Sequence, residues 1–411
     1  MSNETASGIL STLNIGGTDV RLIIDHFSYY ESIYEQTAYA SIALKDASGF
    51  SSLKLDKETE VDFSFGERNG GTIKMKMKIA KSAEGKPVQD KTENITLLAM
   101  PHEFINDNGK SVSKKYTGKD SDIVKKIHEE YTKGSNTIKK SLTVSDSKGE
   151  KQLAGVGQSP LRQINRQAKE AESAKGGASN YVYFQDRDGY HFKTIDEMIK
   201  SNVTNTYAYA QQNIPQGDEK RKILSWDPVK TTDAISAREA GADNTHTYAF
   251  DPTTGKAYSL KKGKRNGQGD AAKTGRNEIT KADKSEADEK RGILSNFFIA
   301  PGGTKSKFRD SRDPNVKKYK RTVDNHASQD TAANQLDNLV INIRVPGDTN
   351  IKVGTNVNLQ FPATGEANKL DKRSGKFLVT RVHHYVYKDD TDIKYNVVME
   401  CKSNSYNESK G

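Results

Sequence analysis

Histidine, cysteine and acidic side chains are the groups best able to bind a metal ion or to catalyse a reaction, and their spacing here matches no motif for either. A zinc-protease helix needs a second histidine four residues after the first, with a glutamate between them. His102 and His128 are each followed by a glutamate. However, the residue four positions after His102 is Asn106, and the residue four positions after His128 is Thr132. The single cysteine, Cys401, excludes an intrachain disulfide and an all-cysteine zinc site. The sequence therefore gives no positive reason to expect an enzyme, a metal site or a cofactor.

Two short runs resemble parts of ligand-binding loops. Gly109-Lys110-Ser111 has the end of a phosphate-binding loop, but Phe104 occupies the position where such a loop needs a glycine. Asp186-Arg187-Asp188-Gly189 resembles the start of a calcium-binding loop, yet His191 stands at the sixth position, where that loop needs a glycine. We therefore expect a β-turn at residues 186–189 and no calcium site.

Three further reactive residues lie on predicted strands near the C-terminus. Consecutive residues of a strand point to opposite faces. The adjacent histidines His383 and His384 therefore do not chelate one ion together, and we expect one in the core and one at the surface. Cys401 shares its predicted face with Val397 and Met399, which is typical of a small buried hydrophobe rather than a nucleophile.

The sharpest electrostatic feature is a row of three lysines, Lys74, Lys76 and Lys78, which alternate with apolar residues. A period of two places all three on one face of a strand. One interpretation is a solvated barrel face or edge, where lysines discourage edge-to-edge pairing. The other is a surface that faces a channel or a neighbouring subunit and meets acidic groups or nucleic-acid phosphate. Both interpretations stay open, and these lysines are the candidate site residues.

The composition favours several modest domains. The chain has 411 residues, of which 33% are hydrophobic and 29% charged, and its formal net charge is +10. Such a length predicts two to four domains. No run approaches the roughly 18 apolar residues of a membrane helix, and the first residues lack a secretory signal, so we expect synthesis in a reducing cytoplasm. Eight lysines and arginines lie between Lys305 and Arg321, which predicts a basic loop.

The elements that position the lysines are predicted to be antiparallel strands. Residues 61–65 and 73–79 each alternate apolar and polar side chains, and the glycine-rich segment 66–71 between them predicts a hairpin turn. Further alternating segments predict a first β-barrel over residues 1–110. From residue 111 to 215 the period becomes helical around Ile123, and Ser159-Pro160 predicts the start of a second helix. A hairpin over residues 181–192 completes a small α+β domain.

The C-terminal part predicts a second β-barrel that is interrupted. Its first part is expected over residues 216–258 and its second part, with the tail, over 335–411, because strong alternation returns there. Residues 259–334 are rich in glycine, lysine, aspartate and asparagine and predict a long charged insertion. The predicted fold class is thus α+β and mainly β, with two antiparallel β-barrels that flank a small α+β domain.

The order of these parts resembles a known family. The segments that carry the resemblance are Ile15-Gly16-Gly17-Thr18, the run 112–119 before the first helix, the run 159–165, the hairpin 183–192 and the strand end 248–252. The chain resembles the baseplate hub proteins of contractile-tailed phages and is similar to the N-terminal hub portion of type VI secretion spike proteins. The resemblance covers residues 1–258 and 335–405, and the insertion between them has no counterpart.

The resemblance implies a structural protein of the virion tail baseplate, assembled in the bacterial host cytoplasm. Three copies would form a homotrimer whose six barrels make a pseudo-six-fold ring. This ring would join the six-fold tail tube to a three-fold central spike and leave a channel for genome passage. The implied partners are copies of the chain, a separate spike protein, the tail tube protein, a baseplate wedge or tape-measure protein, and DNA in transit, with no membrane insertion.

Two rival functions come from other classes. A basic nucleic-acid-binding protein would use residues 256–321 and would lose affinity steeply with salt. A polysaccharide-degrading virion enzyme would need paired carboxylates in a cleft.

Overall fold

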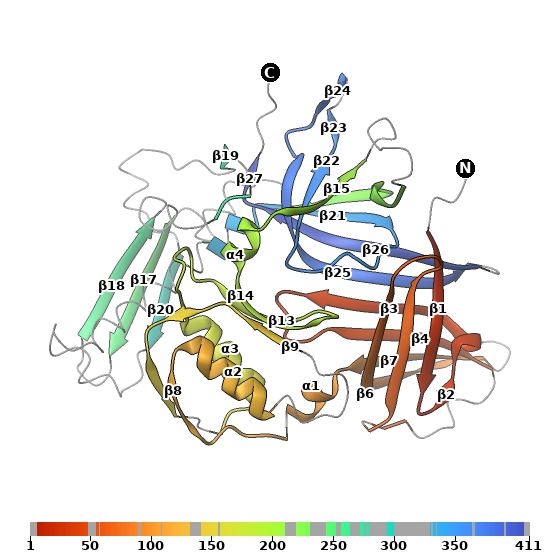
Figure 1. Ribbon diagram of the computed structural model, residues 1–411, viewed down its shortest axis with the longest axis horizontal. Coiled ribbons are helices and arrows are strands. Elements are labelled where there is room, and N and C mark those ends of the chain that lie inside the picture. The colour runs from red at the N-terminus through yellow and green to blue at the C-terminus, as the bar shows by residue number, and fades with distance from the viewer. Residues whose placement is uncertain are drawn as a thin grey trace.

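The structure is a computed structural model, and it is built mainly of strands, as the sequence predicts (Figure 1). It describes residues 6–47, 55–56, 58–88, 92–107, 109–131, 141–154, 157–209, 219–230, 244–251, 256–263, 272–274, 277–278, 294–299, 329, 332–333, 335–363, 366–389 and 392–406. The predicted basic loop at 305–321 lies outside the described residues. No helix in the described part is long and apolar enough to cross a membrane.

In the described part of the chain, thirteen strands form the largest sheet, and eight of them close into a ring. The ring strands are β1 (Ala6–Ile15), β3 (Ile24–Ser32), β4 (Tyr39–Asp46), β5 (Glu60–Glu67), β6 (Thr72–Val88), β7 (Thr92–Met100), β25 (Gly375–Asp389) and β26 (Asp392–Ser403). They pair in the order β25-β3-β4-β7-β6-β5-β1-β26, and β25 also pairs with β26. The short strand β2 (Thr18–Asp19) pairs with β1, and a 3-10 turn (Arg21–Ile23) follows it.

The predicted alternation of apolar and polar residues places the apolar side chains inside the ring. In the β5–β6 hairpin, Phe63 lies opposite Met75 and Phe65 opposite Ile73, and these four side chains are buried. Phe63 and Phe65 pack against Phe27 of β3 with ring centroids 4.8 and 5.1 Å apart. Eight strands enclose a space that side chains can just fill. The ring is therefore a packed core rather than a pore.

A second set of strands uses the same C-terminal hairpin. It runs in the order β15-β22-β25-β26-β21-β16, with β15 (Val203–Ala208), β16 (Ser225–Lys230), β21 (Leu339–Pro346) and β22 (Asn356–Gln360). The two ends of this set meet in a single parallel bridge between Ala208 and Lys222. Lys222 follows a 3-10 turn (Glu219–Arg221). In Figure 1 this set lies above the ring, in green and blue.

Each long strand of the C-terminal hairpin is divided between the two sets. In β25, residues 375–378 pair with β22, whereas residues 381–387 pair with β3. In β26, residues 394–395 pair with β1, whereas residues 396–403 pair with β21. A register shift between Val379 and Arg381 marks the change of partner on β25, and such bulges commonly bend a strand at the rim of a barrel. The predicted boundaries placed this hairpin in the second unit only. The domain boundaries remain a prediction.

The α+β region has a core of its own. Its elements are α1 (His102–Asp107), β8 (Lys115–Gly118), α2 (Asp120–Tyr131), β9 (Ser141–Val144), β10 (Ser147–Lys148), β11 (Lys151–Ala154), α3 (Pro160–Glu170), β12 (Glu172–Ser173), β13 (Tyr181–Gln185) and β14 (Gly189–Thr194). Helix α3 begins at the predicted place, with Ser159 in N-cap geometry and Pro160 at its start. The side chain of Ser159 makes no cap hydrogen bond. Instead, Asp107 of α1 accepts a 2.9 Å hydrogen bond from the backbone N–H of Leu161.

Helix α4 (Ile195–Lys200) joins this region to the large sheet, because its apolar side chains belong to the core of that sheet. A separate three-stranded sheet contains β17 (Asn244–Asp251), β18 (Lys256–Gly263) and β20 (Leu294–Ile299). It lies at the left of Figure 1, away from the ring. Two short pairs remain, β19 (Asn277–Glu278) with β27 (Ser405–Tyr406) and β23 (Pro362–Ala363) with β24 (Glu366–Leu370).

Candidate functional site: a lysine-lined groove and a polar junction

The three predicted lysines lie on β6, on the outer face of the ring. Lys74 and Lys76 are exposed, and the residues between them point into the core, as the alternation predicts. Because the ring is filled by apolar side chains, none of the three faces a channel inside it. Whether they face a neighbouring protein remains a prediction.

The three lysines have different electrostatic surroundings. Lys78 forms an ion pair with Glu58 at 2.5 Å, and only 13% of its side chain is exposed. Lys76 lies across the strand pair from Asp62. Lys74 lies opposite a neutral residue, Ser64. The positive charge of the row is therefore least compensated at Lys74.

A groove of about 440 Å3 lies beside Lys74 and Lys76. It arises where the register of β1 against β5 shifts, because Leu10 pairs with Phe65 but Thr12 pairs with Ser64, and Ser11 has no partner between them. The sequence carries a signal for this bulge, since two polar residues separate the apolar Leu10 and Leu13 and break the period of two. The predictions from sequence did not use that signal.

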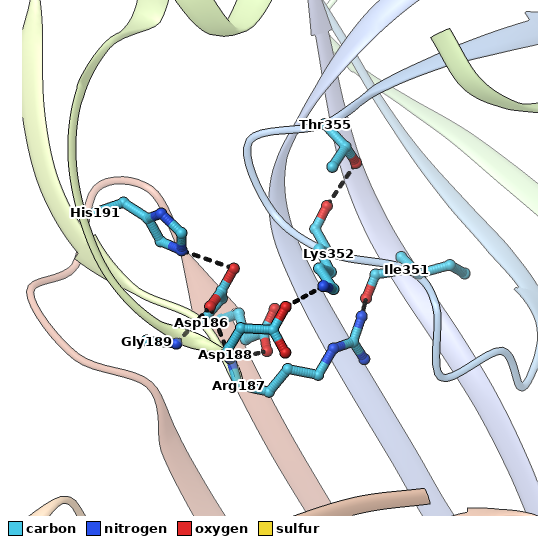
Figure 2. Close-up of polar contacts among 9 residues, drawn as sticks. Asp186, Arg187, Asp188, Gly189, His191, Ile351, Lys352 and Thr355 are labelled. Atoms are coloured by element: carbon cyan, nitrogen blue, oxygen red, sulfur yellow. Dashed lines mark hydrogen bonds and ion pairs between the residues drawn. The ribbon is translucent and has the colours of Figure 1, made fainter. Parts of the chain in front are cut away.

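A second polar site lies at the turn between β13 and β14 (Figure 2). Oδ1 of Asp186 accepts hydrogen bonds from the backbone N–H groups of Asp188 at 2.8 Å and Gly189 at 3.0 Å. Nε2 of His191 lies 2.9 Å from Oδ2 of Asp186. Burial alone raises the pKa of Asp186, but contacts with His191 and the backbone outweigh burial and hold it below its usual value. The β-turn predicted at 186–189 is confirmed.

This turn connects the α+β region to both sets of strands. The backbone N–H of Arg187 donates to Oε1 of Glu31 on β3 at 3.0 Å, and its guanidinium donates to the carbonyl oxygen of Ile351 at 2.5 Å. Lys352 forms an ion pair with Asp188. Figure 2 shows these contacts reaching the loop between β21 and β22. Glu31 is 1% exposed, and burial raises the pKa of its carboxyl group to about 7, although Arg187 opposes the rise.

The two adjacent histidines lie on opposite faces of β25, as predicted. His384 is fully buried, and its Nδ1 shares a 2.7 Å hydrogen bond with the hydroxyl of Tyr395. His383 is on the outer face, but it is partly covered because its ring stacks on Tyr30 at 4.2 Å. Burial lowers the pKa of His383 to about 4. Cys401 is buried in the core, as predicted.

No group of three or more potential metal ligands occurs among the described residues. The described residues place cations and hydroxyls at the groove, and an ionic junction at the turn between β13 and β14 connects the α+β region to the strand sets.

Comparison with known proteins shows similarity in structure and not in sequence. No protein-family model matches the chain, and no curated protein sequence matches it. The tail protein from Neisseria meningitidis MC58 superposes with a TM-score of 0.58 and 10% identity, covering 97% of this chain and 97% of that chain. The 43 kDa tail protein of prophage MuSo2 from Shewanella oneidensis superposes with a TM-score of 0.56 and 8% identity, covering 96% and 98%.

A component of the type VI secretion system from E. coli is more distant, with a TM-score of 0.45, 9% identity and coverage of 98% of this chain and 79% of that chain. The chain thus has the fold of the two tail proteins, one of which comes from a prophage. The relation to phage tail proteins predicted from the sequence is confirmed at the level of the fold.

Proposed function

We propose that the protein is a structural subunit of a contractile-tail baseplate hub and has no enzymatic activity. The observation that carries this proposal is the match to two tail proteins over almost the whole length of both chains. A match of that extent includes both sets of strands and the α+β region, so it concerns the architecture as a whole. The proposed location is the virion tail, after assembly in the bacterial host cytoplasm.

The proposed assembly is a homotrimer. Each chain would contribute two β-barrel tube domains, the ring of eight strands and the second set that shares its hairpin. Three chains would then place six barrels around one axis, so that a true three-fold ring presents a pseudo-six-fold face. One face would bind the tail tube protein and the other the central spike, with a baseplate wedge or tape-measure protein as a further partner.

A channel for DNA would have to run between the copies. Support comes from the packed interior of the eight-stranded ring, where Phe27, Phe63 and Phe65 are all fully buried. In this proposal the outer faces of the described strand sets line the passage. The predicted domain limits at residues 110, 215, 258 and 334 remain part of this proposal.

Light scattering after gel filtration tests the trimer directly. A chain of 45.5 kDa gives a trimer of about 137 kDa, and we expect that mass at micromolar concentration. End-on images in negative stain should then show a three-fold ring with six lobes, since each chain supplies two. A single species of monomer mass without rings would refute the assembly, and three-lobed rings would refute the two-barrel part alone.

A further inference from the structure

The lysine row on β6 is not a uniform stripe of positive charge. Among the described residues, Lys74 and Lys76 form no ion pair, whereas Lys78 is neutralised by Glu58 at 2.5 Å. Asp62 stands across from Lys76 and reduces its field. The remaining positive charge is confined to the part of the strand next to Ser64, where the groove lies.

The groove also offers hydroxyl groups. The β1 bulge turns both Ser11 and Thr12 toward it, and Ser64 and Thr72 complete its polar lining. Ser64 is only 6% exposed, and its Oγ has no hydrogen-bond partner among the described residues. A buried hydroxyl without a partner is unfavourable, and a ligand that accepts its hydrogen bond would relieve that cost. The unpartnered Ser64 and the two lysines therefore point to the same kind of occupant, an anionic acceptor.

We propose that this groove binds a carboxylate side chain from an acidic segment of a partner protein. Lys74 supplies the main charge, Lys76 adds to it, and the Ser64 hydroxyl donates a hydrogen bond to the bound carboxylate. This site goes beyond the proposed hub function and does not depend on it, because it is built within one chain.

Charge complementarity favours a single carboxylate over a nucleic-acid backbone. A DNA strand carries one charge about every 3.4 Å and binds best to a continuous row of free cations. In this chain the row is broken, because Lys78 is paired and Asp62 lies in the groove itself. A short protein segment can place one carboxylate beside Lys74 and keep its other groups away from Asp62.

Fluorescence anisotropy with a labelled hexaglutamate peptide and the full chain tests the site. Lys74→Gln should weaken binding about fivefold, the upper range for one exposed charge contact, and Ser64→Ala should weaken it about twofold to threefold. Lys81→Gln is the matched control, because Lys81 is an exposed lysine of the same strand outside the groove. This control should change affinity less than Lys74→Gln does. The wild type and every variant tested should have the same circular dichroism spectrum.

Three results would overturn the proposal. The first is hexaglutamate affinity that is unchanged in Lys74→Gln, or no binding at all at millimolar peptide. The second is an equal loss in Lys81→Gln, which would indicate a response to net charge only. The third is tighter binding of a six-nucleotide thymidine oligomer than of hexaglutamate, with equal losses for Lys74→Gln and Lys78→Gln. None of these outcomes bears on the trimer, which light scattering measures separately.

Discussion

Replacing Glu31 with glutamine should remove a pH dependence that this residue gives to the stability of the fold. Glu31 is 1% exposed, and burial raises the pKa of its carboxyl group from 4.5 to about 7. Arg187 opposes this rise, and Asp186 adds to it. Glutamine has nearly the same shape, keeps an oxygen that can accept the hydrogen bond from the backbone of Arg187, and does not ionise.

The fold disfavours the ionised form of the Glu31 carboxyl group, and this sets the direction in which stability changes with pH. Because the folded-state pKa lies above the unfolded value, Glu31 contributes stability that is fully present below about pH 4.5 and is lost as the pH rises through about 7. A displacement from 4.5 to about 7 corresponds to about 3 kcal/mol. The free energy of unfolding of E31Q minus that of the wild type should therefore increase by about 3 kcal/mol between acidic and mildly alkaline pH.

Urea unfolding at a series of pH values measures this difference. The single tryptophan, Trp226, reports on the large sheet because its ring packs on Phe361 with centroids 4.8 Å apart. Glu170→Gln is a control of opposite sign. Burial alone raises the pKa of Glu170, but contacts with Lys151 and Arg166 together outweigh burial and lower it. The E170Q variant should therefore lose stability relative to the wild type as the pH rises. A difference curve for E31Q that is flat, or that falls like the control, would refute the reasoning.

Three further predictions concern packing and burial. A Cβ at Gly347 would lie 2.0 Å from the ring of Tyr395, so G347A should lower the free energy of unfolding in urea by about 1–3 kcal/mol. The matched control G109A adds a Cβ 3.8 Å from its nearest neighbour and should change it by less than about 0.5 kcal/mol. The buried Asn356 donates to two carbonyl oxygens at and just beyond the end of α4 at 2.7 and 2.8 Å, and N356A should cost about 2 kcal/mol in the same assay. Burial raises the pKa of the Cys401 thiol, so it should react with Ellman's reagent only after unfolding, and reaction in the folded protein would contradict its buried position.

Local patterns predicted the local structure. The alternation at 61–65 and 73–79 is a property of each strand by itself, and the observed register, with Phe63 opposite Met75, follows from it. The turn at 186–189 was predictable for a similar reason, because the side chain of Asp186 bonds to backbone only two and three residues away. Such contacts require no knowledge of the rest of the chain.

The long-range partners were not predictable from those patterns. Glu31 and Arg187 are 156 residues apart in sequence, and each taken alone is typical of a solvated surface. The division of β25 between β22 and β3 does leave a trace, because the consecutive apolar residues Phe377, Leu378 and Val379 interrupt its period of two beside the register shift. This interruption does not identify the two partner strands, which lie far away in the sequence. The lysine row was predicted correctly as one face, but its unequal charge depends on Glu58 and Asp62, which only the folded chain brings beside it.

The shared hairpin has a consequence for the proposed assembly. Two barrels joined by a flexible linker could rotate against one another. A ring of three such chains would then have six variable angles between neighbouring barrels, three within the chains and three between them. In this chain β25 and β26 belong to both sets of strands, and Gly8 and Gly347 both lie against Tyr395, where β26 changes partner. The turn at Arg187 adds a third connection, because it binds Glu31 in the ring and Ile351 beside the second set. The angle between the two sets is thus fixed within each chain. In a trimer, only the three contacts between chains would remain to be set by assembly.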